Sequence, residues 1–323
     1  MNKSFYIIST IIVLTVFVFF SVFLTGIANT DYTQSANLIL SNPKIADANY
    51  LSILSIQLLT GTFSNIIFMR MFVMICILLS AYLIFNVIKR ATTTQHALVL
   101  SYLYLSLTSI GGYKFGSGAL VCLLSAFLVY IYYLKYDGLI KWYIMLITLS
   151  ILAIHNSVFV FAIFLFPFFC FSRIKRQKTA WTAFVNMIIL FALAFFIKYQ
   201  FIGGFPVNIM TVKGEWVKLF FTDFGTENII ITILFLFGAT SFLFCPKFIK
   251  GYMKFSIIYM ILYILSYKTS HTGATYLMFL PPIYTAFAVS VSHLKVFRKN
   301  KKTFIITLTL ISLIIFSSVL IFN

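Results

Sequence analysis

Long apolar runs recur along the whole of this chain, and they constrain its fold more than any other feature. Hydrophobic residues make up 62% of the 323 positions and charged residues only 9%. A water-soluble domain could not bury so much apolar surface, whereas a bilayer accepts helices of roughly 20 apolar residues. The sequence therefore predicts an all-α, polytopic inner-membrane protein.

The apolar runs divide into about eleven predicted transmembrane helices. They cover roughly 4–26, 66–88, 95–112, 116–134, 142–155, 157–172, 180–198, 228–245, 255–267, 273–292 and 303–322. Residues 50–65 are also apolar, but Gln57, Gly61 and Asn65 interrupt them, so we interpret this piece as a half-inserted helix. We expect one polytopic membrane domain over residues 1–323, with outer loops at about 27–65 and 199–227.

The net charge of +18 comes from basic residues in short clusters between the apolar runs. Such clusters are typical of topology determinants and not of a nucleic-acid surface. With the N-terminus in the cytoplasm, seventeen of the 24 basic residues and one of the six acids fall on the inner side. We interpret His96 and His293, which stand beside inner basic clusters, as solvated. The candidate catalytic and binding residues therefore lie on the outer side, which is periplasmic or extracellular.

A polar break divides the apolar run at 143–172, which as one helix would be about 45 Å long. Lys141 and Arg173 flank the run and both belong to inner clusters, so the chain must cross twice. The turn falls at His155-Asn156-Ser157, near the outer surface. His155 is either a structural histidine bonded to a backbone carbonyl or a general acid or base.

Arg70 is an ionisable residue at membrane depth, in the segment IIFMRMFVMICILL. Either its side chain reaches outward to lipid headgroups, or its guanidinium clamps an anion in an outer cavity. Lys114, in SIGGYKFGSG, belongs either to an ordinary glycine turn or to the same anion site. Asp31 is either a solvated loop acid or a second candidate base.

Further outer residues suit sugar recognition, because aromatic faces stack on sugar rings and carboxylates accept hydroxyl hydrogen bonds. The candidates are Lys213, Glu215, Trp216, Lys218 and Asp223 in the long loop, and Lys268, His271 and Tyr276. The sequence holds no metal-ligand, haem or nicotinamide motif, so we expect no cofactor. The four cysteines lack CxxC spacing and are expected to pack in the apolar interior.

The order of these features resembles the EpsG/Wzy-type polymerases of bacterial exopolysaccharide and O-antigen. The resemblance covers residues 25–172 best. It rests on Asp31-Tyr32 after the first span, on the helix with Arg70, on YKFGSGALVCLLSAFLVY with Lys114, and on Lys141-Trp142 before His155-Asn156-Ser157. The family commonly has arginine and glutamine where this chain has Lys114-Phe115, and an arginine near Lys268.

The resemblance implies a GT-C-like membrane architecture and a metal- and nucleotide-independent glycosyltransferase. Its donor and acceptor would be undecaprenyl-pyrophosphate-linked oligosaccharides, and a flippase and a chain-length regulator would be pathway partners. His155 or Asp31 would be the base, and Arg70 and Lys114 would stabilise the leaving group. Two alternatives stay open. One is a glycosyltransferase using a polyprenyl-phosphate sugar, and the other is a flippase or exporter of lipid-linked glycan.

Overall fold

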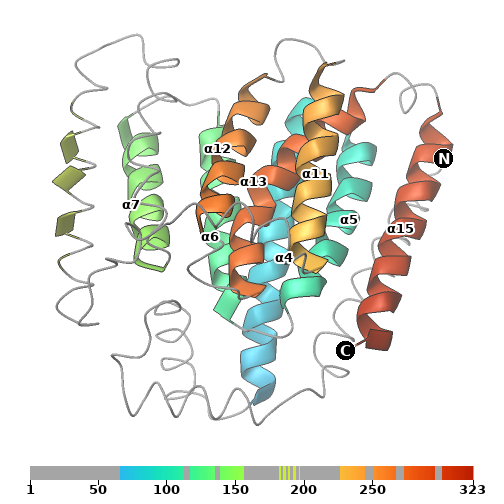
Figure 1. The fold of residues 1–323 in the computed structure, drawn as a ribbon, viewed down its shortest axis with the longest axis horizontal. Coiled ribbons are helices and arrows are strands. Elements are labelled where there is room, and N and C mark those ends of the chain that lie inside the picture. The colour runs from blue at the N-terminus through green and yellow to red at the C-terminus, as the bar shows by residue number, and fades with distance from the viewer. Residues whose placement is uncertain are drawn as a thin grey trace.

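The computed structural model describes residues 66–112, 117–134, 139–155, 226–243, 250–266, 273–294 and 300–322, and eight single positions between 182 and 196. The helices of this part are α4 (Ile66–Ala91), α5 (Thr94–Gly112), α6 (Ser117–Tyr132), α7 (Leu139–His155), α11 (Thr226–Leu243), α12 (Lys250–Ser266), α13 (Gly273–Ser292) and α15 (Lys301–Phe322). Figure 1 shows them side by side as one bundle. The all-α prediction is confirmed for these residues.

These helices lie where the apolar runs predicted helical segments, and polar caps mark some of their ends. Between α4 and α5 the hydroxyl of Thr92 donates to the carbonyl of Ile88, at 3.0 Å. The backbone N–H of His96 then donates to the hydroxyl of Thr93, at 3.4 Å, as at a helix N-cap. The threonines therefore end one helix and begin the next. The expected outer loop at 199–227 is two residues too long, because α11 begins at Thr226.

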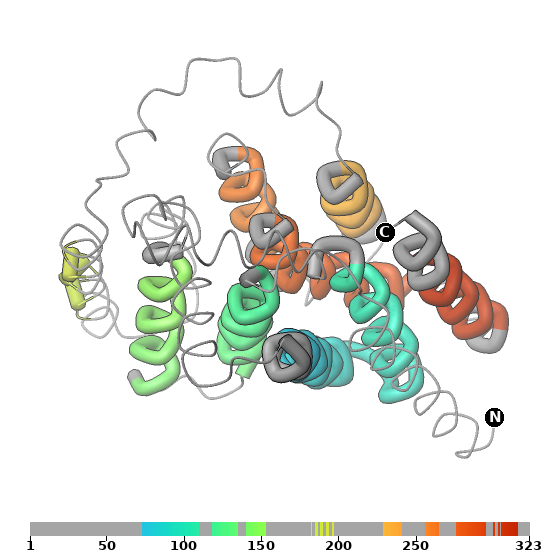
Figure 2. The backbone as a smooth tube through the Cα atoms, turned by 90° about the horizontal axis from the view of Figure 1, so that it is seen from below, coloured from blue at the N-terminus to red at the C-terminus, as the bar shows by residue number. Residues whose placement is uncertain are grey.

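Helix α13 is the centre of the bundle. It packs against α4, α5, α6, α11 and α12, whereas α7 packs on α6 and α15 on α5. Figure 2 shows α7 toward one side of the bundle, α15 at the other and α13 between them. From Tyr276 to Ser292 every side chain of α13 is buried except that of Phe287, which is half-buried. Five of the other described helices are therefore arranged around α13, and α7 and α15 flank this group.

Two prolines stand inside this central helix, Pro281 and Pro282. Because proline lacks an N–H, the carbonyls four residues earlier lose their helical donors. Tyrosine hydroxyls tie α13 to α5 on both sides of the prolines. Tyr276 donates to the carbonyl of Leu107 at 3.1 Å, and Tyr284 donates to that of Leu100. Each half of α13 is thus anchored separately.

The prediction of about eleven transmembrane helices in a GT-C-like architecture is wrong for this structure. Among the described residues only one segment, Val73–Ala91 of α4, is long and apolar enough to cross a membrane. The remaining apolar helical segments there are shorter, such as Gly118–Tyr132 and Tyr276–Ser292. Apolar composition alone overestimates spans, because a helix buried among other helices is as apolar as one in lipid. The predicted spans 4–26 and 157–172 and the half-inserted piece 50–65 lie outside the described residues.

The outer faces of the bundle are rich in large aliphatic side chains at helical spacing. Exposed residues of this kind are Ile140, Ile144 and Ile147 on α7, Ile229, Ile233 and Leu236 on α11, and Ile306, Leu310 and Ile314 on α15. Exposed apolar stripes of this extent mark surfaces that contact lipid or another apolar partner. With the apolar segment in α4, they indicate association with a membrane.

Candidate functional site

One end of the bundle gathers basic residues, and we call it the basic end. Lys89 and Arg90 stand at the end of α4 and Lys141 at the start of α7. Lys250 and Lys254 stand in the first turns of α12, and Lys301 and Lys302 begin α15. Neighbouring helices run in opposite directions, so these helix ends lie together at the top of Figure 1. The sequence clusters interpreted as inner topology signals therefore meet at one end.

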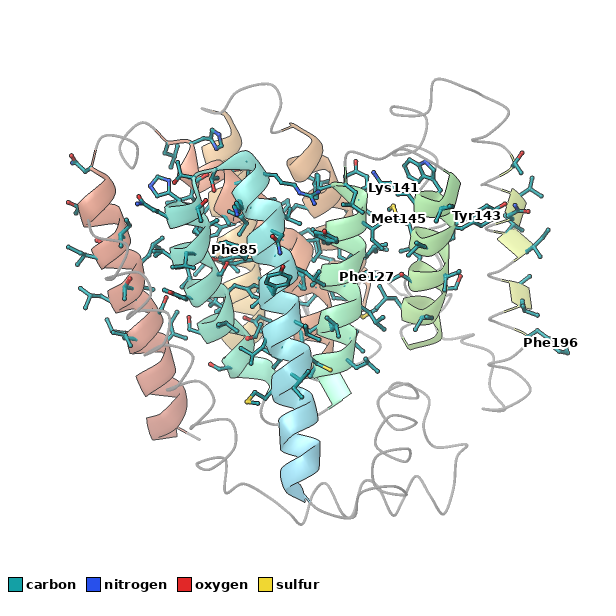
Figure 3. All side chains as sticks on the ribbon, turned by 180° about the vertical axis from the view of Figure 1, so that it is seen from behind. Phe85, Phe127, Lys141, Tyr143, Met145 and Phe196 are labelled. Atoms are coloured by element: carbon teal, nitrogen blue, oxygen red, sulfur yellow. The ribbon has the colours of Figure 1, made fainter. Side chains whose placement is uncertain are left out.

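Some of these cations also cap the C-terminal end of α6. Arg90 donates from Nη1 to the carbonyl of Tyr133 at 2.9 Å, and Lys141 donates from Nζ to that of Leu134 at 2.6 Å. The last carbonyls of a helix lack intrahelical donors and favour cations. Lys141 is only 3% exposed, and Figure 3 places it at the upper end of α7. The basic end therefore joins α4, α6 and α7.

The histidines beside these clusters are buried and not solvated, contrary to the sequence interpretation. His96 is 4% exposed and His293 is 8% exposed. The Nδ1 atom of His293 lies 2.9 Å from the carbonyl of Val289 and 3.2 Å from the hydroxyl of Ser292. The ring thus closes the last turn of α13. The neighbouring lysines in the sequence suggested exposed histidines. The burial of His293 could not be predicted from them, because it depends on the contacts of its ring at the end of α13.

The opposite end of the bundle, which we call the distal end, holds two of the predicted catalytic residues. Arg70 is the fifth residue of α4, and His155 is the last residue of α7. In Figure 1 both termini are the lower ends of their helices, as are the end of α5 and the starts of α6 and α13, and the start of α4 extends well below the lower end of α7. The fold therefore brings the backbone of Arg70 and His155 to the same end, although 84 residues separate them in the chain.

Tyr276 is the one predicted substrate-binding residue whose side chain the structure describes. It lies near the start of α13, is 1% exposed, and donates its hydroxyl to the carbonyl of Leu107 on α5. This hydroxyl stabilises the packing of α5 against α13. Because its side chain is buried between these helices, Tyr276 is not open to substrate in this structure.

The other predicted site residues lie outside the described residues. They are Asp31, Lys114, Lys213, Glu215, Trp216, Lys218, Asp223, Lys268 and His271. The described helix ends on either side of Lys114, at Gly112 and Ser117, belong to the distal end. Within the described ranges no three histidine, cysteine or acidic residues are grouped to hold a metal ion.

A polar cluster in the middle of the bundle was missed by sequence reasoning. The hydroxyl of Tyr104 lies 3.3 Å from that of Ser80 and 3.2 Å from the thiol of Cys122. The ring of Tyr104 also packs on that of Tyr284, with centroids 5.3 Å apart. The cluster joins α4, α5, α6 and α13. Its contacts include no carboxylate or imidazole that could move a proton, so we interpret it as structural.

The sequence contained a weak signal for this cluster. Cys122 was assigned to packing, which is correct, and its hydrogen bonds could not be foreseen. In α5 the serines and threonines bond to carbonyls of their own helix, as Ser101 does to Ala97 and Thr108 to Leu105. Tyr104 differs from these residues, because a tyrosine hydroxyl is too far from its own backbone and, when buried, needs a partner on another helix.

Comparison of the chain with family models, with curated proteins and with solved structures gives no match in any of the three.

Proposed function

We propose that this chain is a bacterial inner-membrane polymerase that joins undecaprenyl-pyrophosphate-linked oligosaccharide repeat units on the periplasmic face. The proposal starts from the order of Asp31, Arg70, Lys114 and His155 along the sequence. The observation that carries it furthest is the common end of Arg70 and His155. In this proposal the basic end faces the cytoplasm and the distal end faces the periplasm, as expected from the preference of lysine and arginine for the inner side.

The proposed reaction transfers a glycan from a lipid diphosphate to a hydroxyl. The bond between the anomeric carbon and the phosphate oxygen breaks, and a new glycosidic bond forms to the acceptor oxygen. His155 takes the acceptor's proton, and the diphosphate leaves on its lipid with both electrons of the broken bond. Arg70 stabilises this leaving group, because a guanidinium fork matches two phosphate oxygens. Asp31 is the alternative base.

Substrate binding in this proposal involves residues on several outer segments. Lys114 adds charge for the diphosphate. The long loop residues Lys213, Glu215, Trp216, Lys218 and Asp223 hold sugar, together with Lys268 and His271. Tyr276 supports the start of α13, where its hydroxyl is engaged with Leu107. The pathway would supply a flippase before this step and a chain-length regulator beside it.

The test is the glycan ladder of a deletion strain that carries the wild type, Arg70→Ala or His155→Ala. We expect the deletion and both variants to leave carriers with a single repeat, and the wild type to restore long chains. Lys302→Ala is the matched control, because it also removes a cation but stands at the basic end. Membrane levels of each protein are measured by immunoblot in the same samples.

Other ladders would reject the proposal. Long chains that lack one branching sugar would indicate a side-chain glycosyltransferase that uses a polyprenyl-phosphate donor. Loss of all surface glycan, with lipid-linked repeats accumulating on the inner face, would indicate a flippase. Long glycan chains in the Arg70→Ala and His155→Ala strains, at normal protein levels, would show that the active site does not include these two residues of the distal end.

A further inference from the structure

Helix α4 carries an exposed stripe with the spacing of a coiled-coil seam. Ile75 and Leu79 are each 47% exposed, and Tyr82 is 62% exposed. Asn86 follows one turn later and is half-buried. Alternating steps of four and three residues place these side chains along one line of the helix, at positions d, a, d and a of a heptad. The outer face of α4 therefore has the pattern by which one helix packs along another.

The other described helices leave this face of α4 open. Helix α4 packs against α5, α6 and α13, and Figure 3 shows it in front of the bundle, with α5 and α6 on either side. The stripe lies within Val73–Ala91, the segment that is long and apolar enough to cross a membrane. A surface of this kind is covered by lipid or by a second protein.

Asn86 distinguishes this stripe from the aliphatic stripes of α7, α11 and α15. Its Nδ2 donates to the carbonyl of Tyr82 at 2.9 Å, and its side-chain carbonyl oxygen has no partner among the described residues. Thr240, an exposed polar residue on α11, bonds its hydroxyl to the carbonyl of Leu236 at 2.9 Å. An amide oxygen cannot be satisfied in this way, because the backbone N–H groups within a helix are already bonded.

Asn186 shows what an asparagine of this chain does when it meets another helix. Its Nδ2 donates to the hydroxyl of Tyr143 on α7 at 2.5 Å. In apolar surroundings, hydrogen bonds from asparagine between helices favour helix association. The Asn86 amide has both donors and an acceptor, so it is complementary to a copy of itself. Two chains inserted in the same direction bring their α4 helices together in parallel, and each seam residue then faces its counterpart.

We propose that the exposed face of α4 is the interface of a homodimer. Each Asn86 amide donates to the side-chain carbonyl of Asn86 in the other copy, and Leu79 and Tyr82 pack along the seam. Lys89 stands at the next seam position, at the basic end, where water and salt screen the repulsion between two copies. The proposal rests on the membrane association described above and is independent of the polymerase activity.

The first test is disulfide cross-linking of the full chain in native membranes with copper phenanthroline. Tyr82→Cys places a thiol on the seam, so we expect a disulfide-linked band of twice the mass of the chain. Leu236→Cys, at a comparably exposed position of α11, is the matched control and should give little of this band. The wild type, with its four native cysteines, gives the background.

The second test measures the dissociation constant of the dimer. Copies labelled with a donor or an acceptor fluorophore are mixed in phosphatidylcholine vesicles, and energy transfer is followed as lipid dilutes the protein. Loss of a hydrogen bond between helices predicts that Asn86→Leu raises the dissociation constant about three- to twentyfold. Asn86→Gln, which keeps an amide, should raise it less. Thr240→Leu, the matched loss of a polar side chain on α11, should change it less than about twofold.

Four results would overturn the proposal. Equal bands from Tyr82→Cys and Leu236→Cys would indicate random collision, and equal dissociation constants for Asn86→Leu and the wild type would exclude the amide pair. A Tyr82→Cys disulfide within one copy would show that another segment of the chain covers this face, and one to a different protein would identify a different partner. Cross-linking of Tyr82→Cys keeps the Asn86 side chain, so it remains informative if Asn86→Leu fails to insert. Neither assay depends on glycan, so their failure and a failed ladder test are distinguishable.

Discussion

The interior of this bundle and its outer faces are both apolar, and they differ in that buried hydrogen-bonded hydroxyl and thiol groups stand among the apolar side chains of the interior. The interior holds hydrogen-bonded tyrosine, serine and cysteine side chains, as at Tyr104, Ser80 and Cys122. The outer faces of α7, α11 and α15 expose isoleucine and leucine at helical spacing. A helix on a water-soluble core shows polar residues outside and apolar residues inside. Hydrophobicity alone therefore does not identify the core of this chain.

The comparison also identifies what holds the helices together. If the surroundings are as apolar as the core, burying isoleucine or leucine yields little free energy. Helix association then depends on close packing and on hydrogen bonds between helices. Close packing can be measured at Gly238 on α11, and hydrogen bonding between helices can be measured at Tyr104 on α5 with Ser80 on α4.

The largest expected effect tests the outer faces. Leu236→Arg places a charge on α11 at a position that is 55% exposed. At the centre of a lipid-facing helix this costs about 3 kcal/mol. We expect the variant to disappear from the membrane fraction, measured by immunoblot. Gln95→Arg, at an exposed position of the basic end, is the control and should be tolerated. Equal levels of the two variants would show that the outer face of α11 does not contact lipid.

The second effect tests close packing in the interior. A Cβ atom on Gly238 would lie 3.2 Å from Cα and 3.4 Å from the backbone nitrogen of Phe287 on α13. Backbone atoms cannot move aside as a flexible side chain can, so Gly238→Val should lower the free energy of unfolding by about 1–3 kcal/mol. Thermal unfolding in detergent measures it. Ala239→Val, at the half-buried next position, should shift the midpoint less, and equal shifts would disprove a close approach of α11 to α13.

The third effect tests hydrogen bonding in the interior. Tyr104→Phe removes the hydroxyl that lies beside Ser80 and Cys122 and keeps the ring. A hydrogen bond between two helices in apolar surroundings contributes about 0.6 kcal/mol on average and up to about 1.7. A double-mutant cycle with Ser80→Ala should give a coupling energy in this range. Tyr82→Phe, at a position that is 62% exposed, is the control. A coupling energy of zero would show that the hydrogen bond between Tyr104 and Ser80 does not stabilise the bundle.

The fourth and smallest effect compares two buried serine hydroxyls in the interior, one with a hydrogen bond and one without. The hydroxyl oxygen of Ser256 on α12 is buried and has no hydrogen-bond partner among the described residues. Removing an unbonded polar group is neutral or stabilising, so Ser256→Ala should change the free energy of unfolding by less than about 0.5 kcal/mol. The same substitution at Ser80 should cost more, because its hydroxyl donates to the carbonyl of Ile77 at 2.8 Å. A loss above about 1 kcal/mol for Ser256→Ala would reveal a partner of its hydroxyl.

The helices were predictable because their signals are local. Polar and glycine breaks bound each apolar run, and the threonines between α4 and α5 satisfy the backbone at their ends. The gathering of lysines and arginines at one end was also predictable, since alternate connections of neighbouring antiparallel helices lie on the same side. The number of spans was not, because the central helix α13 and a lipid-facing helix share the same composition.

For the candidate site, the pattern of apolar runs predicted which helix ends carry Arg70 and His155, and the alternation of helix directions puts both at the same end of the bundle. The bond from Tyr276 to Leu107, the burial of Lys141 as a cap and the contacts by which Tyr104 joins three helices to α13 could be found only in the folded structure. The physical reason is that a hydrogen bond between helices depends on which faces meet and at what depth. Those choices follow from packing across the whole bundle, and no short stretch of sequence encodes them.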